Sequence, residues 1–125
     1  MRRSLLVLVL ALFALAPSLA HAAEKVYVRD PLTNKAHQRP RTVSFRDVDL
    51  TGLKWIHWGK PRAIGRGKAN VLICDTSCAD GHRVNGTVRL VLRKRVMDGN
   101  RRVYQCIDGT ISGVPKAYSK ISWGC

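Results

Sequence analysis

The chain is 125 residues long and carries 22 lysine or arginine residues against 8 aspartate or glutamate residues. This length favours one domain over several. The net charge of +14 disfavours a basic partner and favours an anionic one, such as nucleic acid, an acidic glycan, teichoic acid or anionic lipid. The same charge would keep an exported protein soluble without any partner, so it identifies no ligand by itself.

The N-terminus has the three parts of a secretion signal. An arginine pair at residues 2–3 supplies a positive start, residues 5–16 form an unbroken apolar run, and Ala20-His21-Ala22 supplies the small residues that a signal peptidase reads. The apolar run is too short for a membrane span, which needs about 20 residues. We therefore predict a signal peptide over residues 1–22, cleaved after Ala22, and a secreted, extracellular mature protein.

Two export routes are compatible with this signal. The start Arg2-Arg3-Ser4-Leu5-Leu6 partly resembles a twin-arginine signal, whereas the leucine- and valine-rich run is typical of the general secretory route. No later stretch approaches the length of a span, so we expect no transmembrane segment in the mature chain. Removal of the signal would leave 20 basic against 8 acidic residues, a net charge of +12.

Polar residues and prolines dominate the start of the mature chain. Val26-Tyr27-Val28 is compatible with a short edge strand, but Asp30-Pro31 would end it, and residues 34–40 are polar and basic. We expect residues 23–41 to form a loosely ordered N-terminal segment and residues 42–125 to form a single β domain.

The first strand patterns follow directly. Residues 42–48 alternate and then lose phase at Val48, which predicts a bulge or bend. Residues 53–58 carry apolar side chains on both faces, as is typical of a central strand. In that strand Trp55 and His57 would share one face.

The clearest period of two runs over residues 63–73. Alternate positions are small or apolar, and most positions between them are polar or basic. Gly65 and Gly67 lie on the face with the small or apolar residues. Glycines inside a strand indicate that a bulky group packs closely over the backbone. The indoles of Trp55 and Trp58 are the candidates. A phosphate cradle is the alternative for Gly65-x-Gly67, but it needs a following helix, which the sequence does not predict.

The rest of the chain alternates turns with strands. The pattern predicts a loop at 74–81, a strand at 84–92, a hairpin turn at Asp98-Gly99-Asn100, a returning antiparallel strand at 101–107, a loop at 109–115 and a short tail at 121–125. No segment shows a sustained helical period. We therefore predict a mainly β fold, a small antiparallel sandwich or partly open barrel linked by disulfides.

All four cysteines follow the signal, and an even number in an exported protein predicts two disulfides. The turn-forming residues between Cys74 and Cys78 allow the roughly 4.4–6.8 Å Cα separation that a disulfide needs. Cys106 would then pair with the terminal Cys125.

Zinc binding is the alternative for the cysteine loop. Cys74, Cys78 and His82 would supply three ligands, and Cys106 or His57 the fourth. The irregular spacing and the oxidising compartment favour disulfides instead. We expect no metal and no cofactor.

Candidate catalytic residues are few. Asp80 and His82 share the cysteine loop and could form an acid–base pair, and His57 lies between two tryptophans that could shift its pKa. Structural roles account for these residues as well. Asp80-Gly81 is a dipeptide typical of turns, and His57 would be a strand residue next to packed tryptophans. With all cysteines paired, no thiol nucleophile remains. A small secreted hydrolase acting on a polyanion is therefore the alternative function.

Basic residues line two of the predicted strands. They are Arg62, Arg66 and Lys68 on one strand and Arg89, Arg93 and Arg95 on the other. Because side chains alternate along a strand, each row would share a face. If the strands pack in one sheet, the two rows form a continuous anion-binding surface. A merely solvated outer face is the alternative interpretation.

One resemblance covers about half of the mature chain. The motif Leu53-x-Trp55-x-x-Trp58-Gly59 is followed by Ala63-x-Gly65-x-Gly67 and by Cys74-x-x-x-Cys78-Ala79-x-Gly81, with Val88 and Leu90 beyond. In this combination the chain resembles a group of small uncharacterised secreted proteins of actinobacteria. That group has no assigned activity, so the resemblance implies export and a small β fold only.

Together these features predict an exported, non-catalytic domain that binds an anionic extracellular or cell-envelope partner. The expected partner is an anionic polymer, either a glycan, teichoic acid or nucleic acid. An inhibitor or toxin-like interaction protein is a further alternative beside the hydrolase.

Overall fold

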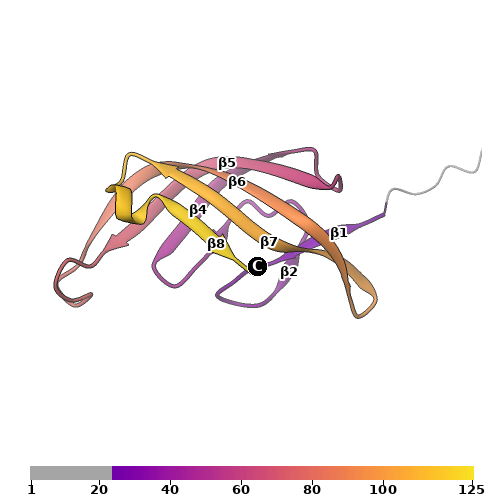
Figure 1. Ribbon diagram of the computed structural model, residues 1–125, viewed down its shortest axis with the longest axis horizontal. Coiled ribbons are helices and arrows are strands. Elements are labelled where there is room, and N and C mark those ends of the chain that lie inside the picture. The colour runs from indigo at the N-terminus through magenta and orange to yellow at the C-terminus, as the bar shows by residue number, and fades with distance from the viewer. Residues whose placement is uncertain (1–23) are drawn as a thin grey trace, which may run out of the picture.

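The computed structural model describes residues 24–125, so the predicted signal peptide lies outside the described residues. The chain is mainly β, as predicted, and has one eight-stranded sheet that curls into a half-barrel (Figure 1). The strands are β1 (Val26–Arg29), β2 (Ala36–His37), β3 (Val43–Ser44), β4 (Val48–Ile56), β5 (Arg62–Ile73), β6 (His82–Asp98), β7 (Arg101–Ser112) and β8 (Lys120–Trp123). Of the two predicted architectures, the partly open barrel is the one observed.

The sheet runs in the order β2-β1-β7-β6-β5-β4-β3. β1 pairs with residues 102–104 of β7 and β8 with residues 107–110, so two short strands share one edge of β7. The pair β1–β7 is parallel, and the other pairings of the described strands are antiparallel. The long strands β5, β6 and β7 run together across the molecule in Figure 1.

The alternation predicted for β5 is confirmed. Ala63, Ala69 and Val71 are buried on the inner face, whereas Arg66 and Lys68 between them are exposed. The predicted hairpin is also present between β6 and β7, and Gly99 has a φ of 62° there, which glycine adopts without strain.

A tryptophan covers Gly65 of β5, as predicted, whereas Gly67 is covered by the Thr51 carbonyl and the Leu53 side chain instead. Gly65 pairs with Trp55 across β4 and β5, and a Cβ on Gly65 would lie 2.6 Å from the indole ring. Trp58 stands edge-on to Trp55, with ring centroids 5.0 Å apart, and edge-on to Tyr104 at 5.4 Å. These three rings pack against the aliphatic core.

The short strand considered at Val26-Tyr27-Val28 is present as β1, and from residue 24 on the N-terminal segment is not loosely ordered, which corrects the expectation for this segment. β1 adds to the edge of β7 and buries Val26 and Val28, which are 2% and 1% exposed. Burial of two valine side chains stabilises this attachment by several kcal/mol, at about 1.5–3 kcal/mol each. The prediction was wrong because a four-residue strand carries too short an alternation to reveal a parallel partner about 75 residues away.

Asp30 connects the two edges of the curled sheet. Its carboxylate accepts hydrogen bonds from the N–H groups of Leu32 and Thr33, each at 3.0 Å, and from the N–H of Ser44 in β3 at 2.8 Å. Leu32 also donates its N–H to the Ser44 carbonyl at 3.1 Å. Because β1 and β3 lie toward opposite edges of the sheet, these bonds keep it curled.

The strand predicted over residues 42–48 is two strands joined by a tight turn. β3 ends at Ser44, and Phe45 donates its N–H to the Val48 carbonyl at 2.8 Å, where β4 begins. The loss of phase, which predicted a bulge or bend, is therefore a bend that reverses the chain. A register shift does occur later in β4, between Thr51 and Lys54.

Both predicted disulfides are present, Cys74–Cys78 and Cys106–Cys125, with Cα separations of 4.6 and 5.3 Å. The second bond holds the end of the chain against β7. The tail predicted at 121–125 contains most of β8, and the short 3₁₀ helix η1 (Lys116–Tyr118) precedes it. Within residues 24–125, no helix is long and apolar enough to cross a membrane.

Candidate anion-binding surface

The outer face of the sheet carries a row of cations that crosses it from strand to strand. Lys54 of β4 pairs with Arg66 of β5, and Arg66 pairs with Arg89 of β6. Arg89 then pairs with Thr110 of β7, and Thr110 with Lys120 of β8. All five side chains are exposed, so cations lie side by side on β4, β5 and β6, and a fourth follows on β8 beyond the uncharged Thr110. Neighbouring strands are about 4.8 Å apart, so the row spans about 19 Å.

Further cations flank this row on the same face. Lys68 lies two residues further along β5 toward the cysteine loop, opposite Thr87, and Arg62 lies opposite Arg93 at the other end of β5. Arg93 is neutralised in part, because its Nε donates to Asp108 Oδ2 at 2.6 Å. We call the set the outer cationic surface, consisting of Lys54, Arg62, Arg66, Lys68, Arg89, Arg93 and Lys120.

A shallow depression lies in the middle of this surface. It has a volume of about 520 Å³, and Arg66, Arg89, Thr87, Thr110 and Ser112 are among its lining residues. Guanidinium groups bind oxyanions through paired N–H donors, and hydroxyl groups can donate to the remaining oxygens. The depression therefore has the donors that a phosphate, sulfate or carboxylate group needs.

Arg95 does not belong to the outer cationic surface, although the alternation of β6 predicted that it would share a face with Arg89 and Arg93. Lys94 has a left-handed backbone, with φ of 60°, which interrupts the alternation. Beyond it, Arg95 pairs with the buried Tyr104 and donates from Nη1 to the Gly59 carbonyl at 2.6 Å. Its guanidinium thus lies at the turn between β4 and β5.

The three catalytic candidates do not come together. His82 begins β6 opposite Ile73, and the nearby Asp80 carboxylate accepts a hydrogen bond from Ser77 at 3.3 Å. His57 lies at the other end of β5, in the turn after β4. The 12 residues of β5 separate the two ends by roughly 36–40 Å. His57 is also not the strand residue that was predicted, because its φ is 58°.

The disulfides remove the thiolates on which the zinc alternative depended. Cys74 is bonded to Cys78 and Cys106 to Cys125, so neither pair can bind a metal as thiolate. In the stretch from residue 24 to 125, no cluster of three or more histidine, cysteine or acidic side chains has metal-binding geometry.

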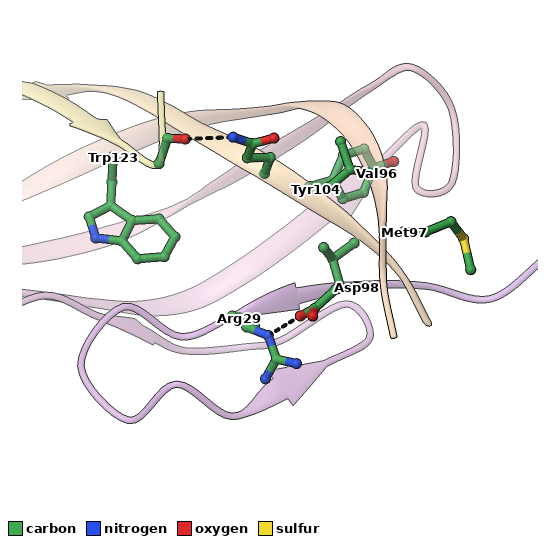
Figure 2. A pocket seen from close by; sticks show the side chains of 9 residues that line it. Arg29, Val96, Met97, Asp98, Tyr104 and Trp123 are labelled. Carbon is green, nitrogen blue, oxygen red and sulfur yellow. Dashed lines mark hydrogen bonds and ion pairs between the residues drawn. The ribbon is translucent and has the colours of Figure 1, made fainter. Parts of the chain in front are cut away.

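A separate pocket of about 390 Å³ lies where β7 passes from β1 to β8, and Figure 2 shows its lining. Trp123 lies on one side of it, and the ion pair of Arg29 Nε with Asp98 Oδ2, at 2.6 Å, lies on another. Gln105 and Gly124 also line the pocket, and the Gln105 amide donates to the Gly124 carbonyl at 3.3 Å. It shares no residue with the outer cationic surface, and its polar groups are largely paired with each other.

Sequence reasoning missed several residues of the surface. Lys54 and Lys120 stand in the central row, and Thr87, Thr110 and Ser112 contribute hydroxyl groups to the depression. They lie on four different strands, so only the register of each pairing brings them together. No local pattern in the chain could have identified them.

Comparison of the chain with models of known protein families, with curated proteins and with solved structures finds no match.

Proposed function

We propose that this protein is an exported, non-catalytic domain that binds an anionic polymer through the outer cationic surface. The observation that carries the proposal is the direct opposition of Arg66 and Arg89, with Lys54 and Lys120 in the same row. No acidic side chain interrupts this row. A linear polyanion laid across the strands would meet a cation on β4, β5, β6 and β8.

The energetics of the free protein support this reading. Like charges directly opposite each other on neighbouring strands are destabilising. The sheet contains two such arginine pairs, Arg66 with Arg89 and Arg62 with Arg93, and an acidic partner is present only for Arg93. An anionic polymer would relieve the repulsion between the arginines, and the release of its counterions would add a favourable, salt-dependent term.

The salt dependence of binding tests the proposal. The exported protein should bind heparin and a poly(glycerol phosphate) teichoic acid, with affinity that falls steeply as salt is added. In the variant Arg66→Gln with Arg89→Gln, the slope of log K against log salt should become shallower by about two, because about one unit is lost per contact. Isothermal titration at several salt concentrations measures both quantities.

The matched control is Lys35→Gln with Arg46→Gln. These two exposed cations lie in turns away from the outer cationic surface, and their loss changes the net charge equally. If both double variants lose the same slope and affinity, binding depends on net charge alone and the proposed surface is wrong. If the protein binds neither polymer at low salt, the solvated-surface interpretation holds instead.

A further inference from the structure

A second, more enclosed basic site lies at the end of the half-barrel, where four separate segments meet. It is a pocket of about 470 Å³, and we call it the mouth pocket. It is lined by Glu24, Lys25, Val26, Gln38, Arg39, Trp58, Gly59, Lys60 and Arg95. None of these residues belongs to the outer cationic surface, so the two sites are distinct.

The charge of the mouth pocket is strongly unbalanced. Lys25, Arg39, Lys60 and Arg95 supply four positive charges, and the single acid, Glu24, is bound by Arg102 Nε at 2.7 Å. Among residues 24–125, no salt bridge includes any of the four cations. Four cations around one concavity repel each other and create a positive potential that a bound anion would relieve.

The walls of the pocket are held in place by hydrogen bonds within the protein. The Trp58 indole donates to the Val26 carbonyl at 3.1 Å. The Tyr104 hydroxyl accepts from the Gly59 N–H at 2.8 Å and donates to the Lys60 carbonyl at 2.7 Å. Arg95 donates one of its five N–H groups to the Gly59 carbonyl, which leaves four N–H groups for other acceptors. These bonds therefore fix the Trp58 ring, the backbone of Gly59 and Lys60, and the Arg95 guanidinium before a ligand binds.

The shape and chemistry of the pocket indicate its ligand. A volume in this range is typical of small-molecule sites, which usually combine an apolar wall with a few polar groups. Trp58 supplies the apolar wall, against which a sugar or other ring can lie. Guanidinium and ammonium groups together bind phosphate oxygens well, and a single carboxylate would leave most of the four charges uncompensated.

We infer that the mouth pocket binds a phosphate group carried by a small ring-containing molecule, such as a sugar phosphate, independently of the polymer on the outer face. The phosphate would lie among Lys25, Arg39, Lys60 and Arg95, and the ring would lie against Trp58. The same phosphate chemistry is present at a monophosphate end of a polymer. Binding of a free monophosphate would therefore show that the phosphate comes from a small molecule and need not be part of a polymer.

The test uses the exported protein with glucose 6-phosphate, pyrophosphate and glucose as probes. Calorimetry should show one site for glucose 6-phosphate and for pyrophosphate, and no binding of glucose. In ¹⁵N-correlation spectra the indole N–H signal of Trp58 should shift on addition of glucose 6-phosphate. Lys60→Glu should weaken glucose 6-phosphate binding roughly tenfold or more, because it removes one charged donor and adds a repelling charge.

The matched control is Lys68→Glu, an equal charge reversal on the outer cationic surface. It should weaken binding of the polymer and leave glucose 6-phosphate binding nearly unchanged. Lys25→Glu provides a second pocket variant should Lys60→Glu lower the melting temperature. The inference is overturned if glucose 6-phosphate shows no binding at about 10 mM, well above the Kd near 1 mM of a weak site. It is equally overturned if Lys68→Glu abolishes binding and both pocket variants retain it.

Discussion

The inside of the half-barrel and the outer face of the β5–β6 pair treat polar groups in opposite ways. Toward the core, every buried side-chain nitrogen and oxygen of the described residues has a hydrogen-bond partner, and Asp30 and Tyr104 illustrate this pairing. On the outer face, Arg66 of β5 and Arg89 of β6 oppose each other, and no acid among residues 24–125 forms a salt bridge with either. Buried polar groups inside the half-barrel are thus paired within the protein, whereas the N–H donors of the outer arginines are left unpaired.

This difference predicts where a substitution will act. A buried polar group without its partner costs the full desolvation penalty, so changes at the inner face should lower stability. An exposed arginine contributes little to stability, so changes at the outer face should alter binding instead. Substitutions at Asp30, Tyr104 and Arg66 test this separation, and their expected effects on stability decrease in that order.

Loss of the Asp30 carboxylate should lower the free energy of unfolding the most. In Asp30→Ala, the N–H groups of Leu32, Thr33 and Ser44 lose their shared acceptor, and the two edges of the sheet lose their connection. We expect the free energy of unfolding to fall by about 2–4 kcal/mol, because hydrogen bonds to a charged acceptor contribute about 1.5–3 kcal/mol each but overlap here. Urea denaturation measures the change.

Asp108→Ala is the control for this prediction, since it removes the same group from the outer face. Its ion pair with Arg93 is more than a third exposed on both sides, so solvent screening limits the loss to about 1 kcal/mol or less. Equal losses in the two variants would show that Asp30 does not hold the edges together.

Tyr104 should make the stability depend on pH above neutrality. Burial raises the pKa of Tyr104 above its ordinary value of 10.0, although the Gly59 N–H and the Arg95 charge act in the opposite direction. The folded state therefore holds the phenol proton more tightly than the unfolded state. Its contribution to stability is complete below about pH 10 and is lost as the pH rises beyond that value.

Tyr104→Phe separates this effect from the titration of other groups. At neutral pH the variant should lose about 1–2 kcal/mol, because the hydroxyl bonds to Gly59 and Lys60 are gone. Between about pH 9 and pH 11 its stability should fall less steeply than that of the parent protein. Parallel curves of unfolding free energy against pH would contradict the assignment. Tyr27→Phe, at a side chain that faces Arg101, is the control.

The smallest expected effect on stability has the opposite sign. Arg66→Glu would place a carboxylate between Lys54 and Arg89 and replace repulsion by attraction on both sides. Opposite charges across strands stabilise by roughly 0.2–1 kcal/mol, so we expect a slightly higher melting temperature together with weaker polyanion binding. Lower stability would mean that Arg66 has a structural role, and unchanged binding would remove it from the binding surface.

Several features of this protein could be predicted from its sequence because they depend on local patterns. The alternation of β5, the Asp98-Gly99-Asn100 turn and the Cys74–Cys78 bond each involve residues close together in the chain. The close packing of Trp55 on Gly65 was also predictable, since a strand glycine needs a bulky cover and few large side chains are available. The Cys106–Cys125 bond was predictable because these two cysteines remain once Cys74 is paired with Cys78.

Other features were decided only by the tertiary structure. The parallel partner of β1, the acceptor role of Asp30 and the row from Lys54 to Lys120 all join segments far apart in the chain. Their positions depend on the register of several strand pairings, and a shift of one residue would send each side chain to the other face.

Arg95 shows the same limit at a single position. The alternation of side chains along β6 predicted that Arg95 would lie on the outer face with Arg89. The left-handed backbone at Lys94 places Arg95 at the mouth pocket instead. Lysine has no special preference for this backbone conformation, so the sequence carries no local sign of the break. The packing of Tyr104 against Trp58 and Gly59 occurs only in the folded sheet, and it is there that the guanidinium of Arg95 finds its acceptor.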